Sequence, residues 1–185
     1  REEYKNKSIP QLLKEQLNQD KYYFINEGGY GPLGVEGAKT ILSEIQVNDY
    51  THILAAVGTG TTLAGIISAA LKGQSIIGIS VLKNNLSVPS EIMDLLPPEK
   101  HMQFLINHDF HFGGYAKYTP GLTSFMNEWF LTTGIPSDFV YTGKLFYGAN
   151  ELIRANYFPN GSKLLIIHSG GLQGNRSLSN GTLIF

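Results

Sequence analysis

The residues with the clearest chemical potential are the small and hydroxylated ones between Ala55 and Gly65, where the sequence reads AAVGTGTTLAG. Glycine lets the backbone approach a ligand closely, and N–H groups that precede a helix point at an anion together with the positive end of the helix dipole. Thr59, Thr61 and Thr62 add hydroxyl donors, and no lysine or arginine lies in the turn. The pattern predicts a site for one phosphate held by neutral hydrogen bonds. A triphosphate is disfavoured, because the turn lacks the Gly-Lys-Ser/Thr ending of a P-loop.

This turn must be held between a strand and a helix. His52 to Val57 is a short apolar run without alternation, as expected for a parallel strand that is covered on both faces, and Leu63 to Leu71 is apolar at helical spacing. The same order occurs earlier in the chain. There, a strand from Lys21 to Asn26 is followed by a glycine pair, and then by a helix from about Val35 to Ile45.

The rest of the chain continues this alternation of strands and helices. Further strands are expected at Ser75–Val81, Gln103–Asn107 and Lys163–His168, and further helices at Ile9–Leu17, Pro89–Leu95, Gly121–Thr133 and Lys144–Asn156. The sequence therefore predicts an α/β fold of three layers, in which a mostly parallel sheet has helices on both faces. Strands near Tyr22, Ile53, Ile76 and Leu165 should be neighbours, and the turns after Val57 and His168 should meet at the carboxyl edge.

Composition excludes several classes of function. The formal net charge is −1 and like charges form no run, so neither a nucleic acid nor a membrane surface is expected as a partner. The absence of cysteine excludes disulfides, thiolate metal sites and a cysteine nucleophile, and it fits the reducing cytoplasm. His108, Asp109 and His111 are close in sequence, but no further ligand suggests a metal site, and none is expected.

Four glycine-containing motifs together resemble one enzyme family. They are Glu27-Gly28-Gly29, Gly58-Thr59-Gly60-Thr61-Thr62-Leu63-Ala64-Gly65, Tyr141-Thr142-Gly143-Lys144 and Ile167-His168-Ser169-Gly170-Gly171. In order and spacing they are similar to those of the pyridoxal-phosphate enzymes of the D-cysteine desulfhydrase and 1-aminocyclopropane-1-carboxylate deaminase family, which has the tryptophan-synthase-β-like fold. The resemblance implies that residues 1–185 form its large domain, which binds the cofactor phosphate, and that the cofactor is pyridoxal 5'-phosphate.

The resemblance also implies roles for individual residues. Tyr115 and Tyr141 would face the substrate as catalytic residues. Ser169 and Gly170 would lie at the pyridine nitrogen of the cofactor, and Thr142 would lie beside its ring. The cofactor phosphate would be bound by the turn after the second strand, namely by Gly58, Thr59, Gly60, Thr61 and Thr62.

One element of the family pattern is absent. The family's Schiff-base lysine lies in an amino-terminal segment and is closely followed by an asparagine, and none of the eleven lysines here has that context. Lys144 and Lys163 are expected in ordinary roles at the starts of a helix and a strand. The chain, which does not begin with methionine, is therefore expected to be a piece of a longer protein and inactive alone. Tyr30 also departs from the pattern, since relatives usually carry a small hydroxyl residue there.

The resemblance implies that the intact protein is a lyase or deaminase acting on a small amino acid, as a homodimer. In the deaminase branch the position of Thr142 is a glutamate that keeps the pyridine nitrogen protonated, and a hydroxyl cannot do this. The sequence therefore favours β-elimination from D-cysteine, giving pyruvate, ammonia and sulfide. The alternatives are 1-aminocyclopropane-1-carboxylate deaminase and a non-catalytic domain that binds a phosphometabolite or nucleotide. The nucleotide is disfavoured, because Ser80 to Lys83 offers no carboxylate for a ribose.

Overall fold

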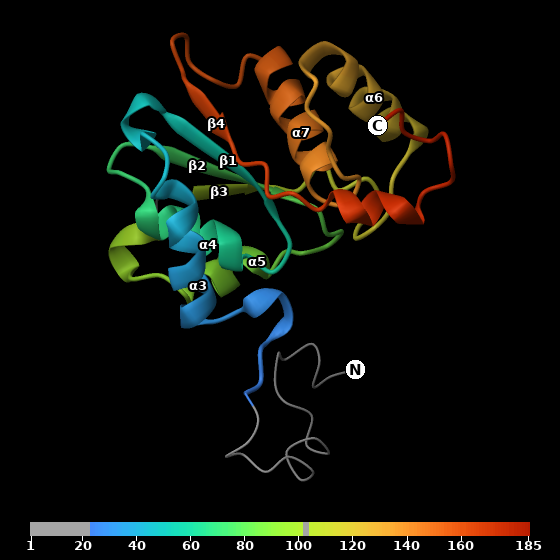
Figure 1. Cartoon of the computed structure of the whole chain (residues 1–185). Helices are drawn as coiled ribbons and strands as arrows, with labels where there is room; N and C mark the ends of the chain where they lie inside the picture. Colours follow the sequence, from blue (N-terminus) through green and yellow to red (C-terminus); the bar gives the residue numbers. More distant parts are fainter. Residues whose placement is uncertain (1–22, 102–103) are drawn as a thin grey trace.

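The computed structural model describes residues 23–101 and 104–185, and its centre is a parallel sheet (Figure 1). The sheet has four strands in the order β3-β2-β1-β4. Their bounds are β1 (His52–Val57), β2 (Ser75–Ser80), β3 (Phe104–Asn107) and β4 (Leu164–Ile166). In the register of the sheet, Ile53 lies opposite Ile76 on one side and Leu165 on the other. The predicted neighbourhood of these three strands is confirmed.

Helices cover both faces of the sheet (Figure 1). One face carries α3 (Pro32–Lys39), α4 (Thr61–Ala69) and α5 (Val88–Met93), and the other carries α6 (Pro120–Thr133) and α7 (Thr142–Arg154). Short 3-10 helices connect these elements: η2 (Glu27–Gly29), η3 (Thr40–Leu42), η4 (Val47–Asp49), η5 (Pro98–Lys100) and η6 (Leu172–Ser177). The predicted three-layer α/β arrangement is confirmed.

The central strands β1 and β2 are apolar between their ends because each of their faces is buried against helices. Side chains alternate between the two faces of a strand. Ile53 and Ile76 accordingly belong to the cluster that includes residues of α4, whereas Leu54 and Ile77 belong to the cluster that includes Leu145 and other residues of α7. A run without alternation is therefore what this position in the fold requires.

One predicted strand is wrong within the described residues. Residues 23–26 form no strand and lead instead into η2, and Tyr23 and Ile25 are 75% and 69% exposed. Aromatic and β-branched residues favour a strand only where neighbouring strands and a packed face receive them, and this segment has neither. The start of this strand at Lys21 and Tyr22, and the predicted helix at Ile9–Leu17, lie outside the described residues.

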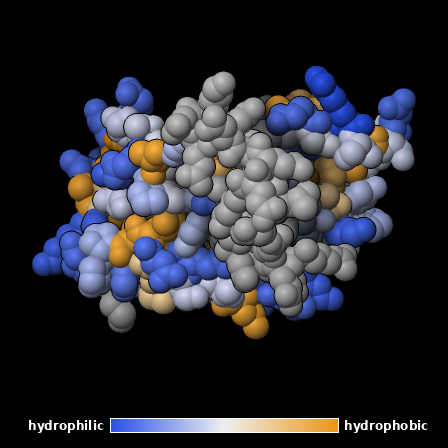
Figure 2. Space-filling view, turned by 90° about the horizontal axis from the view of Figure 1, so that it is seen from below, coloured by the Kyte–Doolittle hydropathy of each residue, from blue (hydrophilic) through white to orange (hydrophobic). Residues whose placement is uncertain are grey.

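The surface is mixed in character. Seen from below, hydrophobic residues form separate patches among hydrophilic ones (Figure 2). Within residues 23–101 and 104–185, no helix combines the length and the hydropathy that crossing a membrane requires.

Candidate active site

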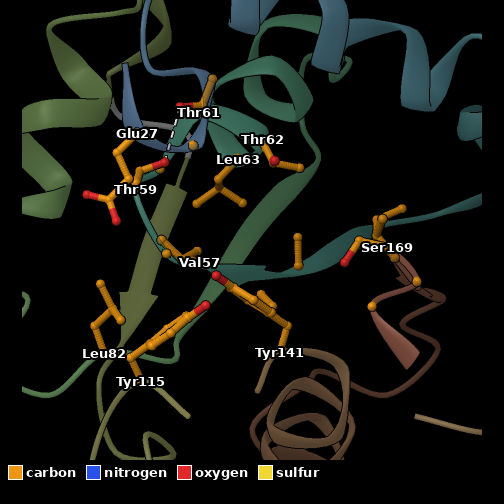
Figure 3. A pocket seen from close by; sticks show the side chains of 18 of the residues that line it. Glu27, Val57, Thr59, Thr61, Thr62, Leu63, Leu82, Tyr115, Tyr141 and Ser169 are labelled. Carbon is orange, nitrogen blue, oxygen red and sulfur yellow. Dashed lines mark hydrogen bonds between the residues drawn. The ribbon is translucent and has the colours of Figure 1, made fainter. Parts of the chain in front are cut away.

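A cavity of about 930 Å³ opens at the carboxyl end of β1 (Figure 3). Its wall combines the turn from Gly58 to Thr62 with residues of η2, of the loop before α6, of the start of α7 and of the turn after β4. The turns after Val57 and His168 thus meet at one edge of the sheet, as the sequence predicts. A volume of this size is typical of sites for small ligands.

The turn after β1 leads directly into the amino terminus of α4. Gly60 precedes the helix in the left-handed conformation with φ 89°, and Thr61 is the first helical residue. The N–H groups of a first helical turn have no acceptor within their helix, so those of α4 are available to an anion. The Thr59 and Thr61 hydroxyls lie 3.3 Å apart, in hydrogen-bond contact (Figure 3). These features are those of an anion-binding turn, and residues Gly58 to Thr62 are called the cradle below.

Neighbouring elements pack closely around this cradle. A Cβ atom at Gly60 would lie 2.6 Å from Cγ1 of Ile92 in α5, and one at Gly28 would collide with the Thr59 side chain. The Asn85 amide also donates a hydrogen bond of 3.0 Å to the Gly58 carbonyl oxygen. Contacts with Ile92, Gly28 and Asn85 therefore fix the backbone of the cradle without a ligand.

Two tyrosines, Tyr115 and Tyr141, lie on the side of the cavity away from Thr61 and Thr62 (Figure 3), and Tyr141 approaches the start of the turn, since a Cβ at Gly58 would lie 3.5 Å from its Cε1. The ring centroids of Tyr115 and Tyr141 are 6.1 Å apart with an interplanar angle of 71°. Burial raises the pKa of the Tyr141 phenol to about 12, and the neighbouring Tyr115 and the carboxylates of Asp138 and Glu27 act in the same direction. Tyr141 is therefore protonated at neutral pH and can donate a proton into the cavity.

The buried carboxylate of Asp138 positions Tyr141. Its Oδ2 accepts hydrogen bonds from the backbone N–H groups of Val140 and Tyr141, both 2.9 Å. Its Oδ1 accepts from the N–H and the hydroxyl of Thr142, at 2.8 and 2.7 Å. A carboxylate at the start of a helix also interacts favourably with the helix dipole. Asp138 thus fixes the backbone from which Tyr141 reaches the cavity.

His168 stabilises the turn that carries Ser169 through two hydrogen bonds. The His168 Nε2 lies 2.8 Å from the Pro136 carbonyl oxygen, and the Gly170 N–H donates to His168 Nδ1 at 3.0 Å. A carbonyl can only accept and an N–H can only donate, so this pair of bonds assigns the ring proton to Nε2. The neutral imidazole therefore holds the Ser169 turn against the segment before α7.

Most of the residues predicted for the site line this one cavity. They are Gly58, Thr59, Gly60, Thr61, Thr62, Tyr115, Tyr141, Ser169 and Gly170. Thr142 is not among the lining residues: its side chain is fully buried, and its hydroxyl is engaged by Asp138, both as donor to Oδ1 and as acceptor from the backbone N–H. The structure therefore does not place Thr142 in the cavity, where the resemblance would put it beside the ring.

The wall also contains residues that were not predicted for the site, among them Glu27, Leu82 and Gln173. Glu27 is the one charged residue among the described residues that line the cavity. It opens the Glu-Gly-Gly motif, which was the available signal. Tyr30 is not in the wall, because its hydroxyl donates a 2.9 Å hydrogen bond to the Glu91 carbonyl oxygen of α5.

The histidine-containing loop before α6 has a structural role. The His111 Nδ1 accepts a 2.9 Å hydrogen bond from the Gly113 N–H, and the side chain of Asn107 bonds to Asp109. Across the described part of the chain, no group of three or more histidine, cysteine or acidic residues is arranged to hold a metal ion.

With this geometry, the comparisons with known proteins decide the family. Residues 6–170 match the family model described as pyridoxal-phosphate dependent enzyme. The chain belongs to this family. A Pyrococcus horikoshii protein, provisionally named 1-aminocyclopropane-1-carboxylate deaminase, is 31% identical over an alignment 179 positions long, which covers 88% of this chain and 54% of that protein.

Two further relatives extend the comparison. A mitochondrial Arabidopsis thaliana protein named bifunctional D-cysteine desulfhydrase/1-aminocyclopropane-1-carboxylate deaminase is 29% identical over an alignment 195 positions long, which covers 94% of this chain and 49% of that protein. A crystal structure described as an ACC deaminase homologue superposes with a TM-score of 0.74 at 28% identity, over 89% of this chain and 55% of that one. The chain spans about half the length of the relatives it matches.

The residues present fit the cofactor of this family. The cradle offers the N–H groups of the first turn of α4, which have no acceptor within their helix, and no lysine or arginine is in the described wall. A phosphate would thus be held by neutral donors and the helix dipole. Ser169 lies on another wall of the same cavity (Figure 3), where it could meet the far end of a ligand anchored at Gly58 to Thr62.

Proposed function

We propose that this chain carries the cofactor-phosphate site and the substrate-facing tyrosines of a pyridoxal-phosphate dependent lyase that acts on a small amino acid. The observation that supports this best is the convergence of the cradle, the tyrosine pair and Ser169 on one cavity. A domain that only binds a phosphometabolite needs the cradle but has no use for two phenols in the same cavity.

Each group has a role in this proposal. The N–H groups of the first turn of α4 and the hydroxyls of Thr59, Thr61 and Thr62 bind the phosphate. Bound pyridoxal phosphate supplies the electron sink for a substrate carbanion. The Ser169 hydroxyl donates a hydrogen bond to the pyridine nitrogen. Tyr141, whose pKa is raised to about 12, holds a proton at its phenol oxygen and can deliver it to the substrate.

Within this family we favour β-elimination from D-cysteine. A neutral hydroxyl at the pyridine nitrogen gives a weaker electron sink than a carboxylate does, and this suffices where a thiol leaves. Asp138, the one buried carboxylate among the described residues, already accepts four hydrogen bonds from the chain. The second candidate is 1-aminocyclopropane-1-carboxylate deamination, which the names of the relatives favour.

Assays of the complete protein separate these candidates. With D-cysteine we expect pyruvate and sulfide, and with 1-aminocyclopropane-1-carboxylate we expect little 2-oxobutanoate. Turnover of the cyclopropane alone would establish the second candidate. Binding of pyridoxal phosphate without turnover of either amino acid would favour the non-catalytic domain.

We further propose that the lysine which binds the cofactor covalently is none of the eleven lysines of this chain, and that residues 1–185 form the large domain of a longer enzyme. None of the described lysines lines the cavity. Borohydride treatment of the 185-residue chain with pyridoxal phosphate, followed by peptide mass analysis, should give no specific adduct. A single modified lysine in high yield would refute this proposal.

The cradle can be tested on the chain itself. Pyridoxal phosphate should bind more tightly than pyridoxal, because only the phosphate reaches the N–H groups of α4. Thr62→Val should weaken phosphate binding severalfold by removing a hydroxyl donor. Thr40→Val, at an exposed threonine after α3, is the matched control and should leave binding unchanged. Equal affinity for both ligands in titration calorimetry would remove the cradle from the proposal.

We also propose where the intact enzyme is located and how many chains it contains. We infer a cytoplasmic homodimer, supported by the absence of cysteine, which suits a reducing compartment, and by the apolar residues that the described chain exposes, including Tyr23, Ile25 and Leu33. Light scattering of the complete protein should give twice the mass of one chain. A monomer at micromolar concentration would contradict the dimer.

A further inference from the structure

A lysine with no role in the proposed chemistry is the largest fully buried side chain of the described residues. Lys144 lies in the first turn of α7 and is 0% exposed. Removing an ammonium from water is costly unless its donors are satisfied. Burial lowers the pKa of Lys144 to about 8, and the negative charge of Asp138 acts in the opposite direction. Because its burial is costly, we looked to its hydrogen-bond partners for the role of Lys144.

The Lys144 ammonium joins separate parts of the chain through backbone carbonyls. Its Nζ donates to the carbonyl oxygens of Gly114 at 2.7 Å, His111 at 2.9 Å and Val81 at 3.4 Å. Three acceptors match the three donors of an ammonium group. Val81 directly follows β2, whereas His111 and Gly114 belong to the loop before α6.

These contacts lie next to both tyrosines of the cavity. Gly114 immediately precedes Tyr115, and Lys144 is three residues after Tyr141 on the same helix start. The two carbonyls with the shorter bonds also close the loop itself, since His111 accepts from the Gly114 N–H and Gly114 accepts from the Lys117 N–H. One ammonium therefore ties the backbone of Tyr115 to the helix of Tyr141.

We propose that Lys144 is a positioning residue, which holds the loop of Tyr115 against the start of α7 so that the two tyrosine rings face the cavity together. It is not a candidate for covalent attachment of the cofactor. Its amine is buried away from the cavity wall and directed at the three carbonyls. If the proposed function holds, this contact sets the distance between the two groups that face the substrate.

The test follows the tyrosine pair by NMR in the 185-residue chain without cofactor, so it does not depend on the proposed enzymatic activity. With ring-labelled tyrosine, assigned through Tyr115→Phe and Tyr141→Phe, the folded protein should show a contact between the two rings. In Lys144→Met this contact should disappear, and the pKa of Tyr141 should fall towards 10. The Gly114 and Lys117 amides should exchange roughly tenfold faster or more.

Two further variants make the result decisive. Lys117→Met removes an exposed lysine from the same loop and should leave the ring contact intact. Gly114→Ala keeps Lys144 but places a side chain at φ 116° with its Cβ 3.3 Å from Cβ of Lys83, so the Gly114 carbonyl must shift. This variant should also lose the ring contact, and it decides the matter if Lys144→Met does not fold. A folded Lys144→Met or Gly114→Ala protein with the ring contact and the Tyr141 pKa unchanged would overturn the proposal.

Discussion

At the scale of single residues, the cavity depends on polar groups that do not line it. Asp138, Lys144 and His168 each bond to backbone atoms beside a residue of the wall. A side chain that faces a ligand is positioned by its own backbone, and the hydrogen bonds of these three residues hold that backbone in place. The residues that line the cavity and the residues that position their backbone are therefore different.

Replacement of Asp138 should be among the most destabilising changes at the site. Asp138→Ala leaves the N–H groups of Val140, Tyr141 and Thr142 without their acceptor. We expect a loss on the order of 3 kcal/mol in the free energy of unfolding, because these bonds are buried and charge-assisted. Urea unfolding measures it.

Two variants serve as references for this prediction. Asp138→Asn retains one acceptor oxygen and should fall between the wild type and Asp138→Ala. Asp109→Ala removes an exposed carboxylate from a loop and should cost less than about 1 kcal/mol. Equal losses for Asp138→Ala and Asp109→Ala would show that the carboxylate does not support the helix.

At the scale of elements, the cradle is a junction of β1, α4 and α5. Val57 ends the strand, Thr61 begins α4, and Ile92 of α5 packs under the glycine between them. Gly60 therefore meets two demands at once, a left-handed backbone and a close approach. A left-handed glycine is common in this chain, whereas the close approach of α5 distinguishes this turn from an ordinary one.

A pair of glycine variants separates these demands. Gly60 and Gly73 have nearly the same conformation, with φ 89° and 93°, but a Cβ at Gly73 meets nothing within 4 Å. Gly73→Ala should cost about 1 kcal/mol of stability through backbone strain alone. Gly60→Ala should cost at least 1 kcal/mol more and abolish binding of pyridoxal phosphate, because Ile92 or the turn must move.

Urea unfolding and titration calorimetry provide the two measurements. If Gly60→Ala and Gly73→Ala lost the same stability and both kept the ligand, the packing of α5 under the cradle would have no energetic weight.

At the scale of the whole molecule, the two helical layers contribute different parts of the site. The α3, α4 and α5 layer supplies the cradle, and the α6 and α7 layer supplies Tyr141 and, through the loop before α6, Tyr115 (Figure 1). The sheet lies between the two layers and fixes their relative position. Lys144 crosses from α7 to the carbonyl that follows β2 and so links one layer to the edge of the sheet.

The burial of Lys144 should be visible in the pH dependence of global stability. The folded chain holds this proton only up to about pH 8, whereas a lysine of ordinary pKa keeps it to 10.5. Between these values the unfolded state binds more protons, so the contribution of Lys144 to the free energy of unfolding rises with pH. The burial penalty is thus fully present below pH 8 and is relieved as the pH approaches 10.5.

Urea unfolding between pH 7 and pH 10 tests this sign. The stability difference between the wild type and Lys144→Met should shift in favour of the wild type as the pH rises, by an amount on the order of 1–3 kcal/mol. Lys163→Met, at an exposed lysine, should follow the wild-type curve in parallel. Parallel curves for Lys144→Met as well would mean that the buried lysine keeps an ordinary pKa.

The sequence alone determined those features that depend on neighbouring residues. The strand from His52 to Val57 has its predicted bounds, and the glycine turn and α4 follow it, because an apolar run, a glycine turn and a helical apolar pattern are contiguous. The parallel order of the remaining strands follows from the alternation of strands and helices. Motif resemblance added Tyr115, Tyr141 and Ser169, which the structure brings to the same cavity.

Only the tertiary structure decided which polar residues are buried and which apolar segments find a partner. The segment from Tyr23 to Ile25 has the composition of a strand but no packed face. Lys144 reads as an ordinary helical lysine, yet its acceptors lie 30 to 63 residues away in sequence. Thr142 likewise matches a ring-facing position and is instead held by Asp138. Hydrogen bonding and burial over such distances depend on how the layers pack, and no local pattern of residue types contains that information.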